Sequence, residues 1–148
     1  MTRKSRYLQG LAEQVAARGY AVPCVGPDAD TRQPPYAYTA GLHVSHGYEL
    51  AISGLPEIAS DLLGLLSGAL TERGTTPADG LIIDGLLHDG YSLRLRPVSN
   101  TGRFRVIGTL FPDLPSAPTI WQALWPDPGH RFPGDAGCRT TSAAQALL

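Results

Sequence analysis

Glycine and proline divide this chain into short segments. Its 148 residues include 17 Gly and 13 Pro, well above the usual share of these residues in globular proteins. Proline removes a backbone donor and glycine favours turns, so both interrupt helices and strands. We therefore expect small strands joined by long loops. Since a chain of this length typically forms one core, we predict a single domain over residues 1–148.

Composition excludes several classes of protein. Hydrophobic residues make up 43% of the chain, which is too many for a disordered protein, and no uncharged run reaches the ~20 residues of a membrane span. The 12 basic and 13 acidic residues give a net charge of −1 without a dense basic block, which argues against nucleic acid as a partner. We expect a soluble protein that does not attach to membranes. The sequence carries no signal for its oligomeric state.

The N-terminal residues and the cysteines indicate a cytoplasmic protein. Gln9, Glu13 and Gln14 interrupt the stretch that an export signal would keep apolar. Cys24 and Cys138 lie far apart in the chain, and we predict two free, buried thiols because disulfides are rare in the cytosol. All but one of the basic residues are Arg, which together with abundant Ala, Gly and Pro indicates a GC-rich bacterial genome.

Apolar spacing predicts two to three helices. The first runs from Ser5, as its cap, to Arg18 and is closed by Gly19. The second begins at Pro56 and ends at Gly74, with an apolar stripe along one face: Ile58, Leu62, Leu65, Leu66 and Ala69. Residues 104–111 fit either a helix or a strand, and we favour a short helix. A weak helix is also expected near Ala143.

Alternating and continuous apolar runs predict the strands. Residues 20–24 read as an edge strand because Pro23 lacks a ladder donor. The remaining strands are expected at residues 36–42, 49–55, 91–98 and 119–125, with a short apolar run at 81–83. The predicted fold class is therefore α+β, with a small, mostly antiparallel or mixed sheet. Five residues should share its core: Leu50, Ile52, Leu62, Leu65 and Leu95.

Three segments carry a family resemblance. They are YAYTAGL at residues 36–42, ISGLP at 52–56, and WPD at 125–127 followed by RFP at 131–133. Together they resemble the YTVGL strand, the FGLP strand-to-helix junction and the WPD…GRFPW block of an uncharacterised bacterial family, domain of unknown function 4262. Their order and spacing cover the chain from about Gly19 onward.

Two loops depart from that family pattern. Residues 46–50 read HGYEL where the family has GHPEL, and Gly134 stands where the family has a Trp. Both departures fall in loops that are expected to form a site. The resemblance therefore implies a fold and a shared surface, but no reaction.

The loop before the second long strand holds two histidines, His43 and His46, spaced H-x-x-H. Histidine is a common metal ligand and titrates near neutral pH. A third ligand could come from Glu49, His88, Asp89 or His130. Because the spacing matches no established metal motif, we favour surface histidines over a metal site. Ser45 with His46, or Cys138 with His130, could also be drawn as nucleophile and base, but sequence proximity does not establish that geometry.

The last loop and one strand face offer further polar groups. Trp125, Asp127 and Arg131 gather after the final strand, where they could bind a ligand or form a structural clamp in which Asp127 pairs with Arg131. Arg94 and Arg96 share one strand face and could receive an anion, although a solvated face is the commoner role of such residues.

These residues lead to one functional hypothesis and one alternative. Parallel neighbouring strands would bring the two loops to the same edge of the sheet, in one cleft. There His46, Glu49 and Asp127 would act as acid or base, and His43, Arg94, Trp125 and Arg131 would bind a small-molecule ligand. The chain would then be a small-molecule enzyme or ligand-binding domain. The alternative is a non-catalytic protein-interaction module. No cofactor, substrate or reaction class is indicated.

Overall fold

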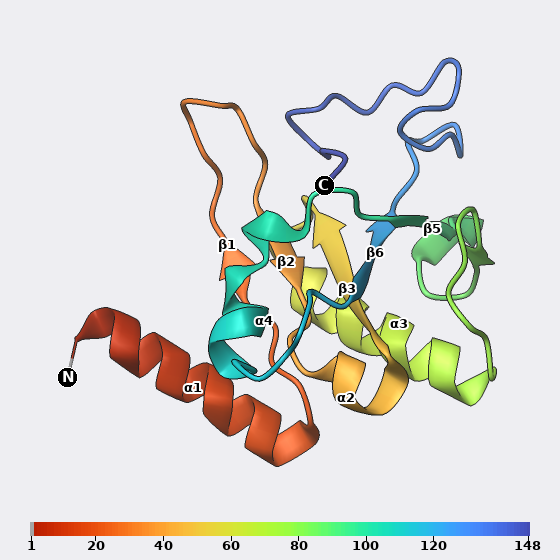
Figure 1. Ribbon diagram of the computed structural model, residues 1–148. Coiled ribbons are helices and arrows are strands. Elements are labelled where there is room, and N and C mark those ends of the chain that lie inside the picture. Colours follow the sequence, from red (N-terminus) through yellow and green to blue (C-terminus); the bar gives the residue numbers. More distant parts are fainter. Residues whose placement is uncertain (1) are drawn as a thin grey trace.

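The computed structural model describes residues 2–148 and is built on one six-stranded mixed sheet (Figure 1). The strands are β1 (Cys24–Val25), β2 (Tyr36–Tyr38), β3 (Tyr48–Ser53), β4 (Ile82–Ile83), β5 (Leu93–Pro97) and β6 (Thr119–Leu124). Their order across the sheet is β1-β2-β3-β6-β5-β4. Within the described chain, β3 and β6 form the one parallel pair, and the other neighbours are antiparallel. The predicted α+β class is confirmed.

Four α-helices are found in residues 2–148, one more than the upper number predicted: α1 (Arg3–Arg18), α2 (Leu42–His46), α3 (Ala59–Glu72) and α4 (Arg105–Leu110). Two 3-10 turns, η1 (His88–Gly90) and η2 (Thr101–Arg103), complete the elements. The additional helix is α2, in the segment expected to be a loop. Its five residues are too few to show a helical period in the sequence. None of the helices within residues 2–148 is long and apolar enough to cross a bilayer.

The sheet has a core on each face. Alternation along β3 sends Leu50 and Ile52 toward α3, and Ala51 toward α4. Of the predicted core, Leu50, Ile52, Leu62 and Leu95 are confirmed as buried. The prediction for Leu65 is wrong, since this side chain is 56% exposed. Helix α3 buries the neighbouring positions 62, 63 and 66, which turns position 65 outward.

Several element boundaries differ from the prediction. The side chain of Thr2, and not Ser5, caps α1 by accepting the Ser5 backbone N–H, while Gly19 closes the helix as expected at φ 93°. The edge position of β1 and the helix at α4 are confirmed. The helix expected near Ala143 is wrong, because residues 142–144 form only a turn.

The Arg face of β5 is partly buried by the segment after β6, so it is not the fully solvated face that was predicted. Arg94 pairs with Asp135 at 2.9 Å and lies over the Phe132 ring at 4.3 Å. Arg96 donates to the Gln122 side chain and to the carbonyl of Leu148. The segment after β6 crosses this face of the sheet, and its loop-like sequence hides that role.

Both cysteines are free thiols, as predicted, but neither is buried. Cys24 is exposed and Cys138 is partly exposed. Cys24 lies on β1, which is an edge strand of the sheet formed by residues 2–148.

Candidate functional site

A sharp turn at Gly41 places α2 against the start of β3. Gly41 adopts φ 130°, and a Cβ there would collide with the carbonyl oxygen of Gly19. Glycine is therefore required on both conformational and steric grounds. Gly47, at φ 83°, ends α2 and leads directly into β3.

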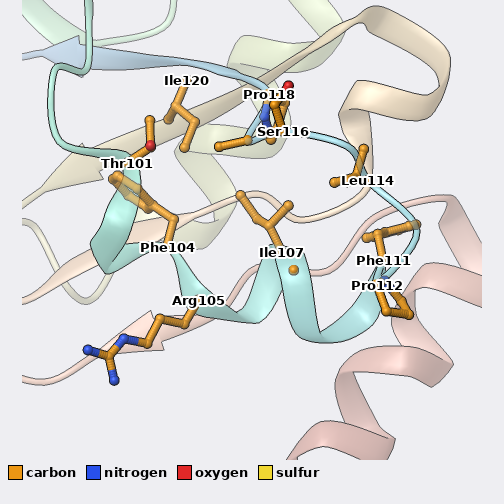
Figure 2. Close-up of a pocket in the computed structure, with 12 residues that line it drawn as sticks. Thr101, Phe104, Arg105, Ile107, Phe111, Pro112, Leu114, Ser116, Pro118 and Ile120 are labelled. Carbon is orange, nitrogen blue, oxygen red and sulfur yellow. The ribbon is translucent and has the colours of Figure 1, made fainter.

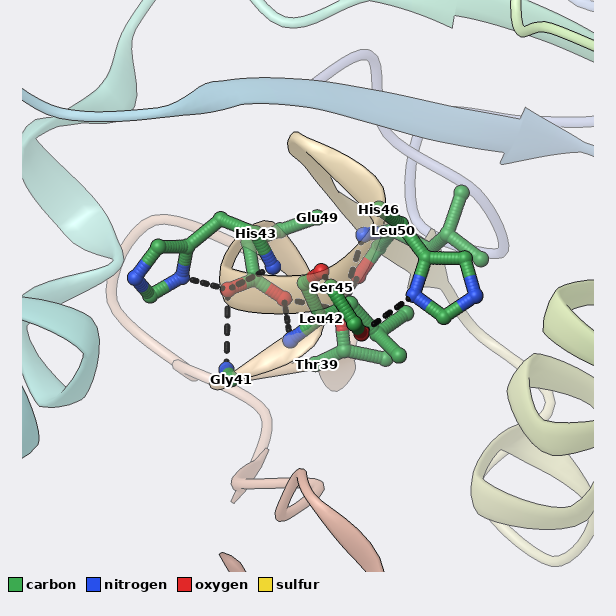
Figure 3. Close-up of polar contacts among 8 residues, drawn as sticks. All are labelled: Thr39, Gly41, Leu42, His43, Ser45, His46, Glu49 and Leu50. Carbon is green, nitrogen blue, oxygen red and sulfur yellow. Dashed lines mark hydrogen bonds and ion pairs between the residues drawn. The ribbon is translucent and has the colours of Figure 1, made fainter.

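Glu49, near the start of β3, is fully buried and caps α2 (Figure 3). Its carboxylate accepts the Thr39 hydroxyl at 2.7 Å and the backbone N–H groups of Gly41, Leu42 and His43 at 2.8, 3.0 and 3.3 Å. The three N–H groups belong to the first turn of a helix and have no partner within it. Burial of a carboxylate is costly unless such donors surround it, so this carboxylate and the helix stabilise each other.

The same carboxylate orients the imidazole of His43. Nδ1 of His43 lies 2.5 Å from Glu49 Oε2, which places the proton of the neutral ring on Nδ1 because an ionised carboxylate only accepts. The ring packs edge-on against Phe111, with centroids 4.7 Å apart. Figure 3 shows the second ring nitrogen on the side away from Glu49. Within residues 2–148, Nε2 has no hydrogen-bond partner, so its lone pair is available.

Two adjoining cavities lie beside His43. One, of about 290 Å³, is lined by His43 and residues 110–114. The other, of about 260 Å³, lies between α4 and the loop that leads into β6, and Figure 2 shows Phe104 and Ile107 on one side of it and Pro118 and Ile120 on the other. The cavities share three lining residues: Phe111, Pro112 and Leu114. A ligand that reaches Nε2 of His43 would therefore meet both the apolar side chains shared by the two cavities and the Asp113 carboxylate.

His46 is held differently from His43. Its Nδ1 lies 2.7 Å from the Ser45 hydroxyl and its Nε2 lies 2.9 Å from the Thr71 hydroxyl. The predicted Ser45–His46 contact is therefore present, but the group on the far side of the ring is a neutral hydroxyl and no carboxylate. Both nitrogens of His46 are occupied, so this ring has no free position for a ligand.

The two histidines do not converge on a metal. Their ring nitrogens face separate partners, Glu49 for His43 and Ser45 with Thr71 for His46. No group of three or more His, Cys, Asp and Glu side chains placed to hold a metal ion occurs among residues 2–148. The Cys138 thiol contacts the carbonyl of Arg131, whereas His130 stacks on Tyr91, so that second nucleophile–base pair is not formed.

Asp127 holds the last loop together. Its buried carboxylate accepts the backbone N–H groups of Gly129, Arg131 and Arg139 at 2.9, 2.9 and 2.7 Å. These bonds, led by that of Arg131, hold the pKa of Asp127 below its usual value. The Arg131 guanidinium instead donates to the carbonyl of Gly137. The structure thus contains a loop clamp, made by backbone N–H groups and not by the predicted pair of side chains.

Trp125 and Arg94 are also engaged within the protein. Trp125 Nε1 donates to the carbonyl of Ser53 at 2.7 Å, which joins the ends of β6 and β3. The Arg94 hydrogen bond is the main reason that the pKa of Asp135 is lowered. Arg94 is therefore already paired with a carboxylate, which argues against the predicted anion site.

The structure separates the two groups of predicted site residues. Strand β2 runs antiparallel to β3, and β3 runs parallel to β6. His43, His46 and Glu49 therefore lie at the start of β3, while Asp127 follows the end of β6 at the opposite end of the sheet (Figure 1). Glu49 pairs with Ile120, and the strand from there to Leu124 alone spans roughly 13 Å. The single-cleft hypothesis is wrong.

The sequence did not point to the residues that complete the His43 site. Thr39 lies inside the YTAGL motif, but nothing in that motif marks its hydroxyl as a partner of Glu49. Phe111 belongs to a segment whose apolar period fits a helix or a strand. Its contact with His43 therefore could not be predicted from the sequence.

Comparison with known proteins places the chain in a family. The family model described as Domain of unknown function (DUF4262) matches residues 14–139, which include both the His43–Glu49 pair and the Asp127 loop. No curated protein and no solved structure shows a significant match. The family match confirms the resemblance in the sequence and covers most of the chain. The protein therefore belongs to the DUF4262 family, a domain of unknown function.

Proposed function

We propose that this protein is a small-molecule enzyme, or a ligand-binding domain built on the same site, in which His43 contacts the ligand and Glu49 positions it. The observation that carries the proposal is the bond from His43 Nδ1 to a buried carboxylate that already has four other donors. A carboxylate on one ring nitrogen fixes the tautomer and leaves the other as a proton acceptor. In a reaction, Nε2 would take a proton from water or substrate, and Glu49 would stabilise the resulting imidazolium.

His43 is the best-supported candidate because the other predicted groups are engaged. The Asp127 carboxylate, the Arg94 guanidinium and both nitrogens of His46 are held by protein partners. His43 alone among the three predicted α2–β3 residues combines a fixed ring, an available nitrogen and an adjoining cavity. Its side chain is 10% exposed, so a ligand would contact a ring that is largely buried and held in one orientation.

The test uses p-nitrophenyl acetate as a general reporter of reactive imidazole. Nε2 would attack the acetyl carbonyl, p-nitrophenolate would leave, and water would release acetate from the acyl-imidazole. We expect His43→Gln to lose most of the protein-dependent rate. His46→Gln is the matched control and should retain it, because that ring is already occupied. Equal rates for the wild type and His43→Gln would overturn an acid–base or nucleophilic role for His43.

The alternative of a non-catalytic interaction module has its own signature. Large apolar side chains are exposed at Val44 (70%), Leu65 (56%) and Ile82 (49%). They lie on α2, α3 and β4, and an interaction surface would have to gather them in one patch. Self-association in native mass spectrometry that is lost in Val44→Ser or Leu65→Ser would favour this alternative.

We also propose that the protein acts as one domain in the bacterial cytoplasm and does not bind nucleic acid. Free thiols at both cysteines support the compartment, and the net charge of −1 supports the absence of a nucleic-acid footprint.

A further inference from the structure

A second cavity lies at the opposite end of the sheet from His43. It measures about 420 Å³ and is lined by Leu55, Ile58, residues 87–89, Tyr91 and residues 125–128. Leu55 follows β3 and Trp125 follows β6. The cavity therefore opens at the carboxyl ends of the parallel strand pair, which is the end where ligands bind in open α/β sheets. We refer to it as the Trp125 cavity.

The polar atoms in the walls of the Trp125 cavity are largely used within the protein. Trp125 Nε1 donates to the Ser53 carbonyl, and the Tyr91 hydroxyl donates to the Pro128 carbonyl at 3.2 Å. The Asp127 carboxylate is taken by three backbone N–H groups. The two aromatic residues consequently offer ring surface, and not their donors, to a ligand. For Tyr91 this is the ring face that His130 does not cover.

The charge of the Trp125 cavity favours a cation. Asp89 lines the cavity, and its carboxylate has no ion pair or hydrogen bond in the part of the chain that the structure describes. The lining, drawn entirely from residues 2–148, contains no Lys or Arg, and its one basic side chain is His88. A carboxylate without a cation beside aromatic rings is the arrangement that attracts organic ammonium groups.

Unusual backbone conformations also gather around the Trp125 cavity. Among the described residues, four that are not glycine have a positive φ: Arg32, Leu55, Asp89 and His130. Leu55 and Asp89 line the cavity, and His130 stacks on Tyr91 with ring centroids 4.4 Å apart. Residues held in sparsely populated conformations cluster at ligand sites, because the surrounding fold must enforce them.

We propose that the Trp125 cavity binds a small organic cation, a quaternary or aromatic ammonium ion whose charge is held by Asp89 and the aromatic faces of Tyr91 and Trp125. The ring faces provide cation–π attraction and apolar contact, while the carboxylate selects positive over negative charge. This site is separate from the His43 site and does not depend on it.

The test measures binding of benzyltrimethylammonium by isothermal titration calorimetry, with phenylacetate as an anion that carries the same ring. We expect saturable binding of the cation and much weaker binding of phenylacetate. Failure of benzyltrimethylammonium to saturate at millimolar concentration, or equal binding of phenylacetate, would overturn the proposal.

Four variants locate the binding. Asp89 is exposed, so Asp89→Asn should weaken cation affinity by roughly two- to fivefold, as for an exposed ion pair. Asn tolerates the left-handed backbone at this position (φ 59°). Asp113→Asn, which alters a carboxylate lining the cavity beside His43, is the matched control and should leave affinity unchanged. Tyr91→Phe keeps the ring and should retain binding, whereas Tyr91→Leu should lose it. Unchanged affinity in both Asp89→Asn and Tyr91→Leu would place the cation elsewhere and overturn the assignment.

Discussion

The carboxylate of Glu49 binds both the backbone N–H and the imidazole Nδ1 of His43. One side chain on β3 thus fixes the start of a helix and the orientation of a ring on that helix. The capping role explains why a carboxylate is buried there. The bond to the imidazole also fixes the tautomer and orientation of His43, on which the proposed chemistry depends.

Glu49→Gln should destabilise the protein. The side-chain amide of Gln would replace one acceptor oxygen by an NH2 group, which cannot accept from the donors that the Glu49 carboxylate binds. Each buried donor left unsatisfied lowers the free energy of unfolding by about 1–3 kcal/mol. Urea denaturation measures the change in the free energy of unfolding. Glu57→Gln alters an exposed carboxyl and should stay within about 0.5 kcal/mol of the wild type. Equal stability of the two variants would show that the Glu49 contacts contribute little.

His43 and His46 should hold opposite neutral tautomers, although they are three residues apart in the chain. His43 donates from Nδ1 to Glu49. Thr71 uses its own proton on the Ser67 carbonyl, so it accepts from Nε2 of His46. Long-range proton–nitrogen NMR correlations distinguish the two tautomers. An Nε2-protonated neutral ring at His43 would contradict the proposed availability of that nitrogen.

Asp127→Asn should be destabilised at neutral pH and much less so in acid. The folded-state pKa of Asp127 lies below the unfolded value of about 3.9 because three backbone N–H groups favour the charged form. Its stabilising contribution is therefore present above that unfolded value and is lost as the pH falls through the folded pKa.

Thermal melts of the wild type and Asp127→Asn between pH 7 and pH 2 test this dependence. The two curves of melting temperature should converge in acid, whereas the exposed Asp113→Asn should follow the wild type throughout. A constant offset between the wild type and Asp127→Asn would refute the titration argument.

Leu62→Ala and Leu65→Ala should differ sharply in stability. Leu62 is 4% exposed and packs on the sheet, so its truncation should cost about 2–5 kcal/mol. Leu65 is 56% exposed, and its truncation should cost less than about 1 kcal/mol. Chemical denaturation of both variants makes the comparison. Similar losses would mean that the face assigned to α3 is incorrect.

Local signals in the sequence were enough to predict α3, β3 and β6, since these elements are closed by prolines and glycines and have a readable apolar period. The period of the α4 segment fits a helix or a strand, so its helix was only the favoured alternative. The predictions failed for side chains whose burial or pairing depends on a segment that is distant in the sequence. Leu65 fits the apolar stripe of α3 as well as Leu66 does, and only the position of the sheet selects between them. Arg94 has the pattern of a solvated face, and only the later Asp135 changes that role.

The candidate site was predicted in part. His43, His46 and Glu49 are neighbours, as their proximity in the chain indicates. Asp127 was placed with them because strand direction cannot be read from a single sequence. Once β2 is antiparallel to its neighbour β3, the loops that follow β2 and β6 lie at opposite ends of the sheet.

The position of β6 has a consequence for folding during synthesis. This strand is the last of the six along the chain, yet it lies between β3 and β5 and pairs with both. Until residue 124 leaves the ribosome, β3 and β5 each keep an open edge and the sheet remains in two halves. Pairings between such distant segments form slowly, and unpaired strand edges promote aggregation. Nascent chains of this protein should therefore depend on chaperone protection until β6 joins the halves.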